Sequence, residues 1–259
     1  MRGCVRGWWR EVSRLVLPGG CAGCGAAMAW PLCGACGAAL DGAGAGPVCW
    51  AERGSGPVGL PVVYAGAAYE GAVRAVVLAH KERGALPLAG PLGARSRRRC
   101  CGRPGGRAGR VRRELALVPV PSARRTVRAR GHDPARRIAL AASARLRAAG
   151  VPARVAPVLR LRRPVEDQAG LGAARRWENL AGALAVRPGG VRLTAGARIL
   201  LVDDLITTGA TLAEASRALR AAGVGARGLG AEAAAVVAAP GASFDRIRPT
   251  TRTEQKSCE

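Results

Sequence analysis

The sequence predicts an α/β protein in which helices flank a parallel β-sheet, preceded by a small module that carries four cysteines. Strand-like apolar segments alternate with segments of helical spacing along much of the chain, which is typical of a parallel sheet with helices on its faces. A continuous apolar run at 199–202 ends in two adjacent aspartates, as expected at the end of a buried parallel strand. Two Cys-x-x-Cys pairs lie close together near the N-terminus.

The composition is that of a globular and strongly basic protein. Its 259 residues are enough for one α/β domain with a small additional module, or for two modest domains. Hydrophobic residues make up 49% of the chain, which argues against a fully disordered protein. The formal net charge of +24 attracts anions, a class that includes nucleic acid, phosphorylated metabolites and acidic membrane surfaces.

Part of the positive charge is concentrated in residues 94–113, which contain nine arginines and no acidic residue. We expect this segment to be a long loop or a disordered insert. Two interpretations are open. The segment is either a solvated insert without a ligand or an electrostatic contact to nucleic acid, such as single-stranded DNA.

The sequence also bears on localisation. No stretch of 18 or more apolar residues occurs, so we expect no membrane span. The first residues lack the apolar core of a secretory signal, and we therefore expect a cytoplasmic protein. In the cytoplasm, cysteines are more often metal ligands or free thiols than disulfides.

Residues 1–20 are expected to form an amphipathic helix that ends at Pro18. Its apolar residues share one side, so it either packs on the body of the protein or binds a partner or membrane surface. Composition divides the rest of the chain into segments. These are a four-cysteine module at 21–50, a linker at 51–61, the α/β domain at 62–239 and a tail at 240–259 that we expect to be disordered.

Periodicity predicts the elements of the α/β domain. Strands are predicted at 62–69, 115–120, 155–161, 198–202 and 231–239. Helices are predicted from 70 to about 81 and at 134–149, 170–180 and 211–222. Asp133 and Pro134 mark a helix start, because Asp is a good N-cap and proline suits the first helical position. Residues 124–133 are predicted to be a basic loop.

The cysteine spacing predicts a structural metal site. Cys21 and Cys24 form one pair, and Cys33 and Cys36 form a second pair after eight intervening residues. Each pair can hold one metal ion through two thiolates, and four thiolates suit tetrahedral zinc. Such a site is closed, so catalysis at the metal is not expected. A redox-active dithiol pair and a site that has lost its metal are the alternatives.

Other residues near the cysteine pairs have simpler explanations. Gly23 and Gly34 lie inside the two pairs, where tight turns need small residues. Cys49 lies close enough in the sequence to substitute as a ligand. Cys100 and Cys101 are adjacent and lie in the basic insert, and we assign them no role.

A second candidate site begins at the end of the apolar run 199–202. Asp203 and Asp204 repel each other and lose hydration there, an arrangement that costs stability unless a polar or cationic group is received. Small and hydroxyl residues follow and lead into a helix, whose N-terminal N–H groups and dipole favour an anion. We interpret the segment as a ribose-phosphate site. Its loop residues are Thr207, Thr208, Gly209, Ala210 and Thr211.

A purely structural explanation of the same loop is also open. Thr211 and Glu214 have the spacing of a capping box, in which Glu214 would compete with a phosphate for the first N–H groups of the helix. Such a cap explains neither the two adjacent aspartates nor the additional threonines.

Residues 200–212 (LLVDDLITTGATL) resemble the phosphoribosyl pyrophosphate (PRPP) binding motif of type I phosphoribosyltransferases. The resemblance implies the type I phosphoribosyltransferase fold. It assigns the catalytic role to Asp203 and Asp204, which would contact the ribose hydroxyls, and it places residues 207–211 around the 5′-phosphate. It also implies that Mg²⁺ binds together with PRPP.

Further segments resemble the ComF family, late-competence proteins with a zinc-ribbon-like module before a phosphoribosyltransferase domain. The resemblance covers about residues 21–237. The matching segments are the helix ending at Leu17-Pro18, the four cysteines, 69–74 with Lys81, 118–121, Arg130-Gly131, Gln168 with Arg175, Arg176 and Asn179, and 200–212. His132-Asp133-Pro134 departs from the family's usual Phe-Asn-Gln, and the basic insert has no expected counterpart.

The resemblance also implies that five further residues contact pyrophosphate or substrate. Each of these residues also has a purely structural explanation. The candidates are Lys81, Arg130, Gln168, Arg176 and Asn179. Lys81 could equally be a solvated lysine at a helix end, and the others could lie on solvated surfaces. We interpret His132 as a structural or capping residue, with acid–base chemistry as the alternative.

The resemblance implies an enzyme that displaces pyrophosphate from C1 of the ribose, with a role in competence and DNA uptake. Catalysis would depend on positioning and electrostatic stabilisation. The alternative is a non-catalytic phosphoribosyl-binding or nucleic-acid-binding protein that acts with single-stranded DNA and DNA-uptake proteins. A structural adaptor held together by zinc is a third interpretation.

Overall fold

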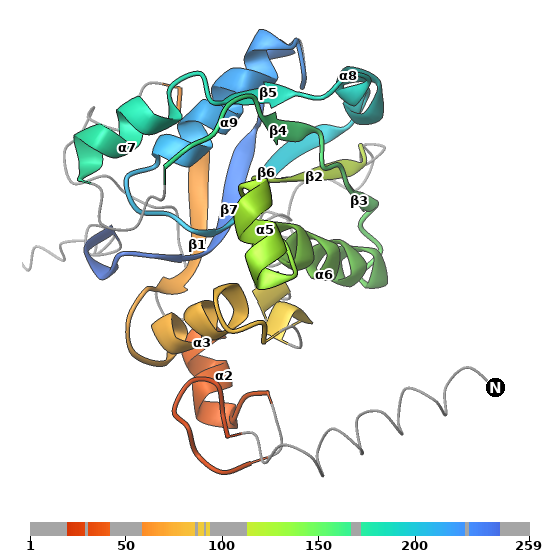
Figure 1. Cartoon of the computed structure of the whole chain (residues 1–259). Helices are drawn as coiled ribbons and strands as arrows, with labels where there is room; N and C mark the ends of the chain where they lie inside the picture. The colour runs from red at the N-terminus through yellow and green to blue at the C-terminus, as the bar shows by residue number, and fades with distance from the viewer. Residues whose placement is uncertain are drawn as a thin grey trace, which may run out of the picture.

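Figure 1 shows the computed structural model of the chain, which describes residues 20–28, 31–41, 59–85, 88–90, 92–93, 113–166, 172–225 and 228–243. Several sequence predictions fall outside these residues. They concern the N-terminal helix up to residue 19, most of the linker, the basic insert up to residue 112, the tail from residue 244, and the residues Cys49, Cys100, Cys101 and Gln168.

The centre of the fold is a five-stranded parallel sheet, which confirms the predicted class. Its strands are β1 (Val62–Ala68), β2 (Leu115–Pro119), β3 (Ala153–Val155), β6 (Arg198–Leu205) and β7 (Ala233–Ala239). They lie in the order β1-β7-β6-β2-β3, and each neighbouring pair is parallel. In the middle strand β6, Leu200 lies opposite Leu117 of β2 and Ala233 of β7. Continuous apolar runs form such strands because both faces are buried.

Helices cover both faces of this sheet and create two cores (Figure 1). The helices are α3 (Gly71–Lys81) and α6 (Pro134–Ala148) on one face and α9 (Ala210–Ala221) on the other. Successive residues of a strand point to opposite faces. Accordingly, Leu200 and Val202 of β6 join the core beneath α3 and α6, whereas Ile199 and Leu201 join the core beneath α9.

A smaller antiparallel sheet packs against α9. Its strands are β4 (Leu159–Leu161) and β5 (Leu184–Val186), with α7 (Ala173–Leu180) between them and α8 (Gly190–Thr194) after them. The buried carboxylate of Glu214 in α9 fastens this sheet. Leu184 N donates to Glu214 Oε1 at 2.9 Å, and Arg217 Nε donates to Glu214 Oε2 at 2.6 Å. Helix α9 is therefore held between the two sheets.

The structure corrects two sequence predictions. The predicted strand at 155–161 is two separate strands, β3 and β4, because Pro157 between them cannot donate a ladder hydrogen bond. The predicted basic loop at 124–133 contains helix α5 (Arg124–Arg130). This helix buries no residue, so it has no apolar periodicity by which the sequence could have revealed it. Strand β5 and helix α8 were not predicted, because three and five residues are too short for a periodic signal.

The remaining predicted elements are confirmed, with small changes at their ends. Strand β6 continues to Leu205, so Asp203 and Asp204 lie within the strand rather than after it. Asp133 caps α6 as predicted, and its Oδ1 accepts a hydrogen bond from Arg136 N at 3.0 Å. In the predicted tail, residues Gly241–Ser243 form a 3-10 turn, η3.

The four-cysteine segment packs on the same core as α3. Its helix α2 (Gly34–Asp41) contacts α3 and β1, and Leu40 is completely buried in the core beneath α3 and α6. In Figure 1, α2 lies beside α3 on the side away from the small sheet. Among the described residues, no helix has both the length and the apolar character needed to cross a bilayer.

We expect Glu214→Ala to lower the free energy of unfolding by about 2–4 kcal/mol, because it leaves the buried Leu184 N–H without its acceptor and removes the carboxylate that pairs with Arg217. Glu214→Gln keeps one acceptor oxygen and should cost less. Urea unfolding of the parent chain and both variants measures the effect. Equal stability of the parent and Glu214→Ala would contradict the proposed link between α9 and β5.

The contribution of Glu214 to the stability of the fold should depend on pH. Burial raises the pKa of Glu214, but Arg217 and the Leu184 N–H outweigh burial and bring the pKa below its usual value of 4.5. The carboxylate therefore contributes stability above that usual pKa, and the contribution is lost as the pH falls through the lower value of the folded state. The stability difference between the parent and Glu214→Gln should shrink as the pH is lowered from about 7 to about 3. A difference that stays constant over this range would contradict the stabilising role of the ionised carboxylate.

Candidate functional site

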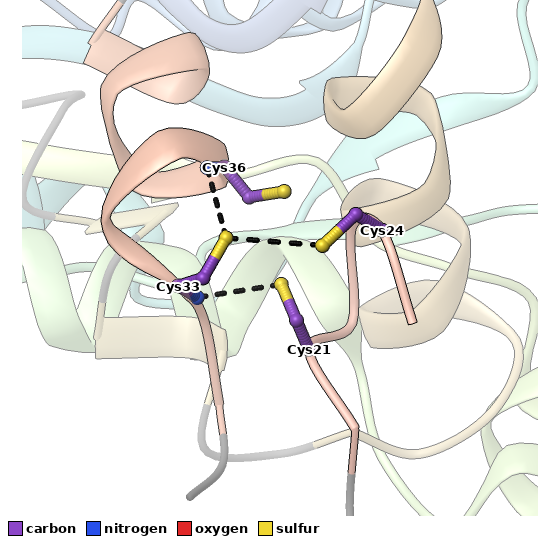
Figure 2. A group of neighbouring side chains, drawn as sticks. All are labelled: Cys21, Cys24, Cys33 and Cys36. Carbon is purple, nitrogen blue, oxygen red and sulfur yellow. Dashed lines mark hydrogen bonds between the residues drawn. The ribbon is translucent and has the colours of Figure 1, made fainter. Parts of the chain in front are cut away.

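The four cysteines of the two Cys-x-x-Cys pairs come together, as predicted (Figure 2). Their Sγ atoms all lie within 4.8 Å of one another, and Cys24 Sγ lies 3.8 Å from Cys33 Sγ. Tetrahedral Zn–S bonds of about 2.3 Å place neighbouring sulfurs roughly 3.8 Å apart. All four residues are free thiols rather than disulfides. The cluster is therefore positioned to bind one metal ion and is compatible with structural zinc.

Local structure explains how the two pairs meet. The first pair lies in a turn, where Gly25 N donates to Cys21 O at 2.8 Å. The second pair lies at the start of α2, with Cys33 just before the helix and Cys36 in its first turn. Backbone N–H groups also bond the sulfurs, since Cys33 N lies 3.3 Å from Cys21 Sγ and Cys36 N lies 3.3 Å from Cys33 Sγ. The predicted ribbon-like module thus carries its second pair at the start of a helix.

Gly23 occupies a position of this cluster where a side chain does not fit. A Cβ at this position would lie 2.7 Å from Cys36 Sγ and 3.3 Å from the Cβ of Ala72. Since Ala72 belongs to the first turn of α3, the cysteine cluster lies directly against the beginning of that helix. A larger residue at position 23 would have to displace a metal ligand or α3.

The surroundings of Cys21 and Cys36 shift the pKa values of their thiols in opposite directions. Burial alone would raise the pKa of Cys21, but N–H groups of Cys33, Cys24 and Gly23 stabilise its thiolate and lower the pKa to about 6. Burial raises the pKa of Cys36, and hydrogen bonds to its neighbouring cysteines raise it further. Thiolates are the form that binds metals, and a bound cation would favour this form at Cys36.

The second candidate site lies at the carboxyl ends of the parallel strands. The chain passes from β2 to β3 in one direction along the sheet and from β6 to β7 in the opposite direction. The ends of the neighbouring strands β2 and β6 therefore flank the topological switch point, where open α/β sheets bind ligands. Asp203 and Asp204 lie at this end of β6.

Lys81 reaches this strand end from the last position of α3. Its Nζ lies 3.0 Å from Asp204 Oδ2 and 3.3 Å from Oδ1. The Asp204 side chain is 7% exposed and that of Lys81 is 32% exposed, so the ion pair is largely shielded from water. By strand alternation, Asp204 points to the same face as Val202, which is the face that α3 covers. The structure therefore brings Lys81 to the aspartate pair.

The two aspartates interact closely. Asp203 Oδ1 accepts a hydrogen bond from Asp204 N at 2.8 Å. Burial raises the pKa of Asp203 well above its usual value, the charge of Asp204 raises it further, and Lys81 opposes this rise. Burial also tends to lower the pKa of Lys81, but the two aspartates outweigh burial and raise it. Two carboxyl groups and one ammonium therefore lie together at this strand end.

The loop after β6 leads directly into α9. The helix begins after Gly209, whose φ of 78° is in the left-handed region that favours glycine. Ala210 N makes a long contact of 3.4 Å with Thr208 Oγ1. Within the described part of the chain, the N–H groups of Gly209, Thr211 and Leu212 have no hydrogen-bond partner. Such N–H groups at a helix start are the donors that bind anions.

The capping-box explanation of this loop does not hold. The Glu214 carboxylate bonds Leu184 N and Arg217 instead of the start of its own helix, and no side chain caps α9. The sequence spacing alone could not distinguish these two uses of Glu214, because Leu184 lies 30 positions away. The first N–H groups of α9 are consequently left for another acceptor.

Two further predicted residues lie near the strand end. Arg176 of α7 donates from Nη1 to Thr207 Oγ1 at 3.4 Å, which places it beside the loop. Arg130, the last residue of α5, donates from Nη2 to Glu82 Oε1 at 2.6 Å. Arg130 is therefore held next to Lys81 by an ion pair with the adjacent residue of the chain.

Another predicted contact, Asn179, bonds the backbone of Glu166. Asn179 Oδ1 accepts from Glu166 N at 3.0 Å, and its Nδ2 donates to Glu166 O at 3.1 Å. The amide is thereby committed to the chain's own backbone. Gln168 lies outside the described residues. Sequence reasoning gave no role to Glu82, because its partner Arg130 lies 48 positions away and no local pattern reveals the pairing.

The chain matches no protein-family model, and no curated protein is significantly similar to it. Inference about function therefore depends on the geometry of the cysteine cluster and of the strand-end site.

We expect Gly23→Ala to weaken metal binding, because the added Cβ would lie 2.7 Å from Cys36 Sγ. Titration with Co²⁺, followed by its thiolate charge-transfer absorption, measures the affinity, and we expect a loss of at least about tenfold. Gly37→Ala is the matched control. A Cβ at Gly37 meets nothing within 4 Å, and alanine favours the helix, so this variant should bind Co²⁺ like the parent. Parent-like affinity of Gly23→Ala would contradict the arrangement.

We expect Asp203→Asn to stabilise the fold at high pH. The amide keeps an oxygen for Asp204 N but removes a carboxylate whose pKa is raised by burial and by Asp204. Ionisation of such a group opposes folding above its usual pKa of 3.8. At pH 8 the free energy of unfolding of the variant should exceed that of the parent by about 0.5–2 kcal/mol, a common size for a single stabilising substitution. This difference should vanish toward about pH 4. Lower stability than the parent at pH 8 in urea unfolding would contradict this.

Proposed function

We propose that the chain binds PRPP together with Mg²⁺ at the carboxyl ends of β6 and β2, transfers the phosphoribosyl group to an acceptor and releases pyrophosphate. One observation carries the proposal, namely the juxtaposition of Asp203 and Asp204 with the uncapped start of α9 at the switch point of the sheet. Carboxylates accept hydrogen bonds from sugar hydroxyls, and a helix start binds phosphate. The type I phosphoribosyltransferase fold and ComF family membership are part of the same proposal.

In this proposal the aspartates recognise the sugar. Asp203 and Asp204 accept hydrogen bonds from the ribose hydroxyls, and their negative charge stabilises the positive charge that develops on the sugar when the bond to pyrophosphate breaks. Their mutual repulsion in the free protein favours a ligand that donates hydrogen bonds to both. Residues 207–211 hold the 5′-phosphate through backbone N–H groups and threonine hydroxyls.

The cationic groups act on the opposite end of the ligand. The ammonium of Lys81, placed beside Asp204, attracts the pyrophosphate, and Arg130 lies in the adjacent ion pair with Glu82. Mg²⁺ bound together with PRPP would neutralise negative charge on the pyrophosphate as it leaves. The chain contributes positioning and fixed charges, with no covalent step on a side chain.

The cysteine cluster has a structural role in the proposal. Four thiolates occupy every position of a tetrahedral zinc ion, so the ion has no open site for chemistry. The cluster lies against Ala72 at the beginning of α3, and α2 packs on the same helix. Zinc would therefore stabilise the helix that carries Lys81 at its end.

A second candidate function is binding without catalysis. The net charge of +24 favours an anionic polymer such as single-stranded DNA. A chain that binds PRPP without turnover would be a phosphoribosyl-binding or nucleic-acid-binding component of DNA uptake. Release of pyrophosphate in the presence of candidate acceptors distinguishes the enzyme from the binding protein.

Calorimetric titration with PRPP and Mg²⁺ tests the proposal. The double variant Asp203→Asn/Asp204→Asn should bind more than about 100-fold more weakly, since two charge-assisted hydrogen bonds of at least about 1.5 kcal/mol each are lost. Binding by the parent without pyrophosphate release would favour the second candidate function. Absence of PRPP binding by the parent chain would refute both PRPP-based functions.

The chain offers a matched control at the other end of the sheet. Glu114 precedes β2 and pairs with Arg154, and Glu232 precedes β7 and pairs with Arg198. Glu114→Gln/Glu232→Gln removes the same two charges at the amino ends of the strands. This control should bind PRPP like the parent, which separates a local effect of the aspartates from a change in net charge.

A further inference from the structure

Lysine is rare in this chain. Of its 41 basic residues, only Lys81 and Lys256 are lysine, and the rest are arginine. Lys81 is the only lysine among the described residues, and its ammonium is paired with Asp204. An ammonium is a compact charge on a flexible four-carbon stem, unlike the planar guanidinium of arginine. Its position therefore depends on how firmly the backbone at the end of α3 is held.

The residues on both sides of Lys81 are held by one other segment, residues 130–134. His132 Nε2 lies 2.9 Å from His80 O, and Arg130 Nη2 lies 2.6 Å from Glu82 Oε1. His80 Nε2 in turn lies 3.4 Å from Pro134 O. Lys81 pairs with Asp204 at the strand end, while its two neighbours bond residues 130–134, from the end of α5 to the start of α6.

The hydrogen bond from His132 is the buried part of this connection. His132 is 6% exposed and His80 is 1% exposed, and their rings pack edge to face with centroids 5.6 Å apart. Both ring nitrogens of His132 face carbonyl oxygens, because Nε2 lies 2.9 Å from His80 O and Nδ1 lies 3.0 Å from Arg130 O. A neutral imidazole donates from one nitrogen only, and the shorter, buried contact favours Nε2 as the donor, to His80 O. His80 O belongs to the last turn of α3, whose carbonyls have no partner within the helix. His132 therefore supplies a partner that the helix end itself lacks.

The Arg130–Glu82 ion pair is the weaker part of the connection. The Glu82 side chain is 43% exposed, and exposed ion pairs contribute little to stability. A buried hydrogen bond whose loss leaves a buried carbonyl without a partner has a larger effect. The burial of the two contacts therefore identifies His132, rather than Arg130, as the residue that fixes the end of α3.

We propose that His132 is a positioning residue for Lys81: by donating its Nε2–H to the carbonyl oxygen of His80, it fixes the end of α3 so that the Lys81 ammonium stays on Asp204. The consequence for PRPP rests on the proposed function, because a Lys81 that has left Asp204 is no longer aligned with the pyrophosphate. Positioning of Lys81 itself does not depend on the identity of the ligand.

The scarcity of lysine makes a direct test practical. Reductive methylation with ¹³C-formaldehyde labels only Lys81, Lys256 and the N-terminal amine, so NMR reports the chemical shift and titration of Lys81 in the whole chain. The charged groups that act on Lys81 are Asp204, Asp203 and Arg130. Asp204→Asn identifies the Lys81 signal and defines its behaviour without the ion pair. Lys256 is the internal reference in every spectrum.

Three substitutions at His132 separate the donor from the ring. His132→Phe keeps the ring packing against His80 and removes the donor, so the Lys81 signal should move toward its position in Asp204→Asn and its pKa should fall. His132→Gln places an N–H near the position of Nε2 and should keep the parent signal. His132→Asn places its amide near the position of Nδ1 instead and should behave like His132→Phe. If His132→Phe does not fold, the Lys81 signals of His132→Gln and His132→Asn are compared instead, because these two variants differ in the position of the donor.

Two results would overturn the inference. The first is a Lys81 signal and titration unchanged in His132→Phe and His132→Asn while Asp204→Asn changes both. The second is an equal change in His132→Gln and His132→Asn, which would assign the effect to the ring rather than to the donor.

The effect on ligand binding is measured separately. PRPP affinity should fall about tenfold in His132→Phe and stay near the parent value in His132→Gln, a change of roughly 1.4 kcal/mol for the former. Failure of the parent chain to bind PRPP would refute the proposed function alone, because the NMR comparison still decides whether His132 positions Lys81.

Discussion

Two adjacent carboxylates at the end of a buried strand are the constraint on which the rest of this structure depends. Asp203 and Asp204 extend an apolar strand that is paired with β2 as far as Val202 and with β7 beyond it, so the sheet holds their backbone in place. Burial and the neighbouring charge of Asp204 raise the pKa of Asp203, and the ammonium of Lys81 from α3 opposes this rise. Such an arrangement is retained more readily at a binding site than in a structure built for stability alone.

Helix α3 connects the two candidate sites. Its first turn lies against Gly23 and the cysteine cluster, and its last residue is Lys81 at the strand end. Its buried face joins the core that also includes Leu40 of α2 and Leu200 of β6. A metal ion bound by the cysteines and the contact that we propose for His132 would therefore act on opposite ends of the same helix.

Helix α9 has a comparable dual role on the other face of the sheet. Its Glu214 is used to hold the small sheet of β4 and β5, and this use prevents the residue from capping its own helix. The start of α9 is consequently open at the same strand end as the aspartates. One side chain thus explains both how the small sheet is attached and why donors remain for an anion.

Much of the architecture could be predicted from the sequence, because it depends on local patterns. The apolar run before Asp203, the Asp133-Pro134 helix start and the two Cys-x-x-Cys pairs each specify an element or a site within a few residues. Predictions failed where the local pattern was misleading or missing. Pro157 divided an apolar segment into strands of different sheets, and α5 buries no residue that would reveal a helix.

The sequence by itself determined the parallel sheet, the position of the aspartate pair at its strand end and the set of cysteines that come together. These features follow from periodicity and from spacing over a few residues. Only the tertiary structure decided that Lys81 pairs with Asp204, 123 positions away, and that His132 bonds the backbone of His80, 52 positions away. Pairings of this kind depend on how helices pack across the sheet, and no local pattern of residues encodes that geometry.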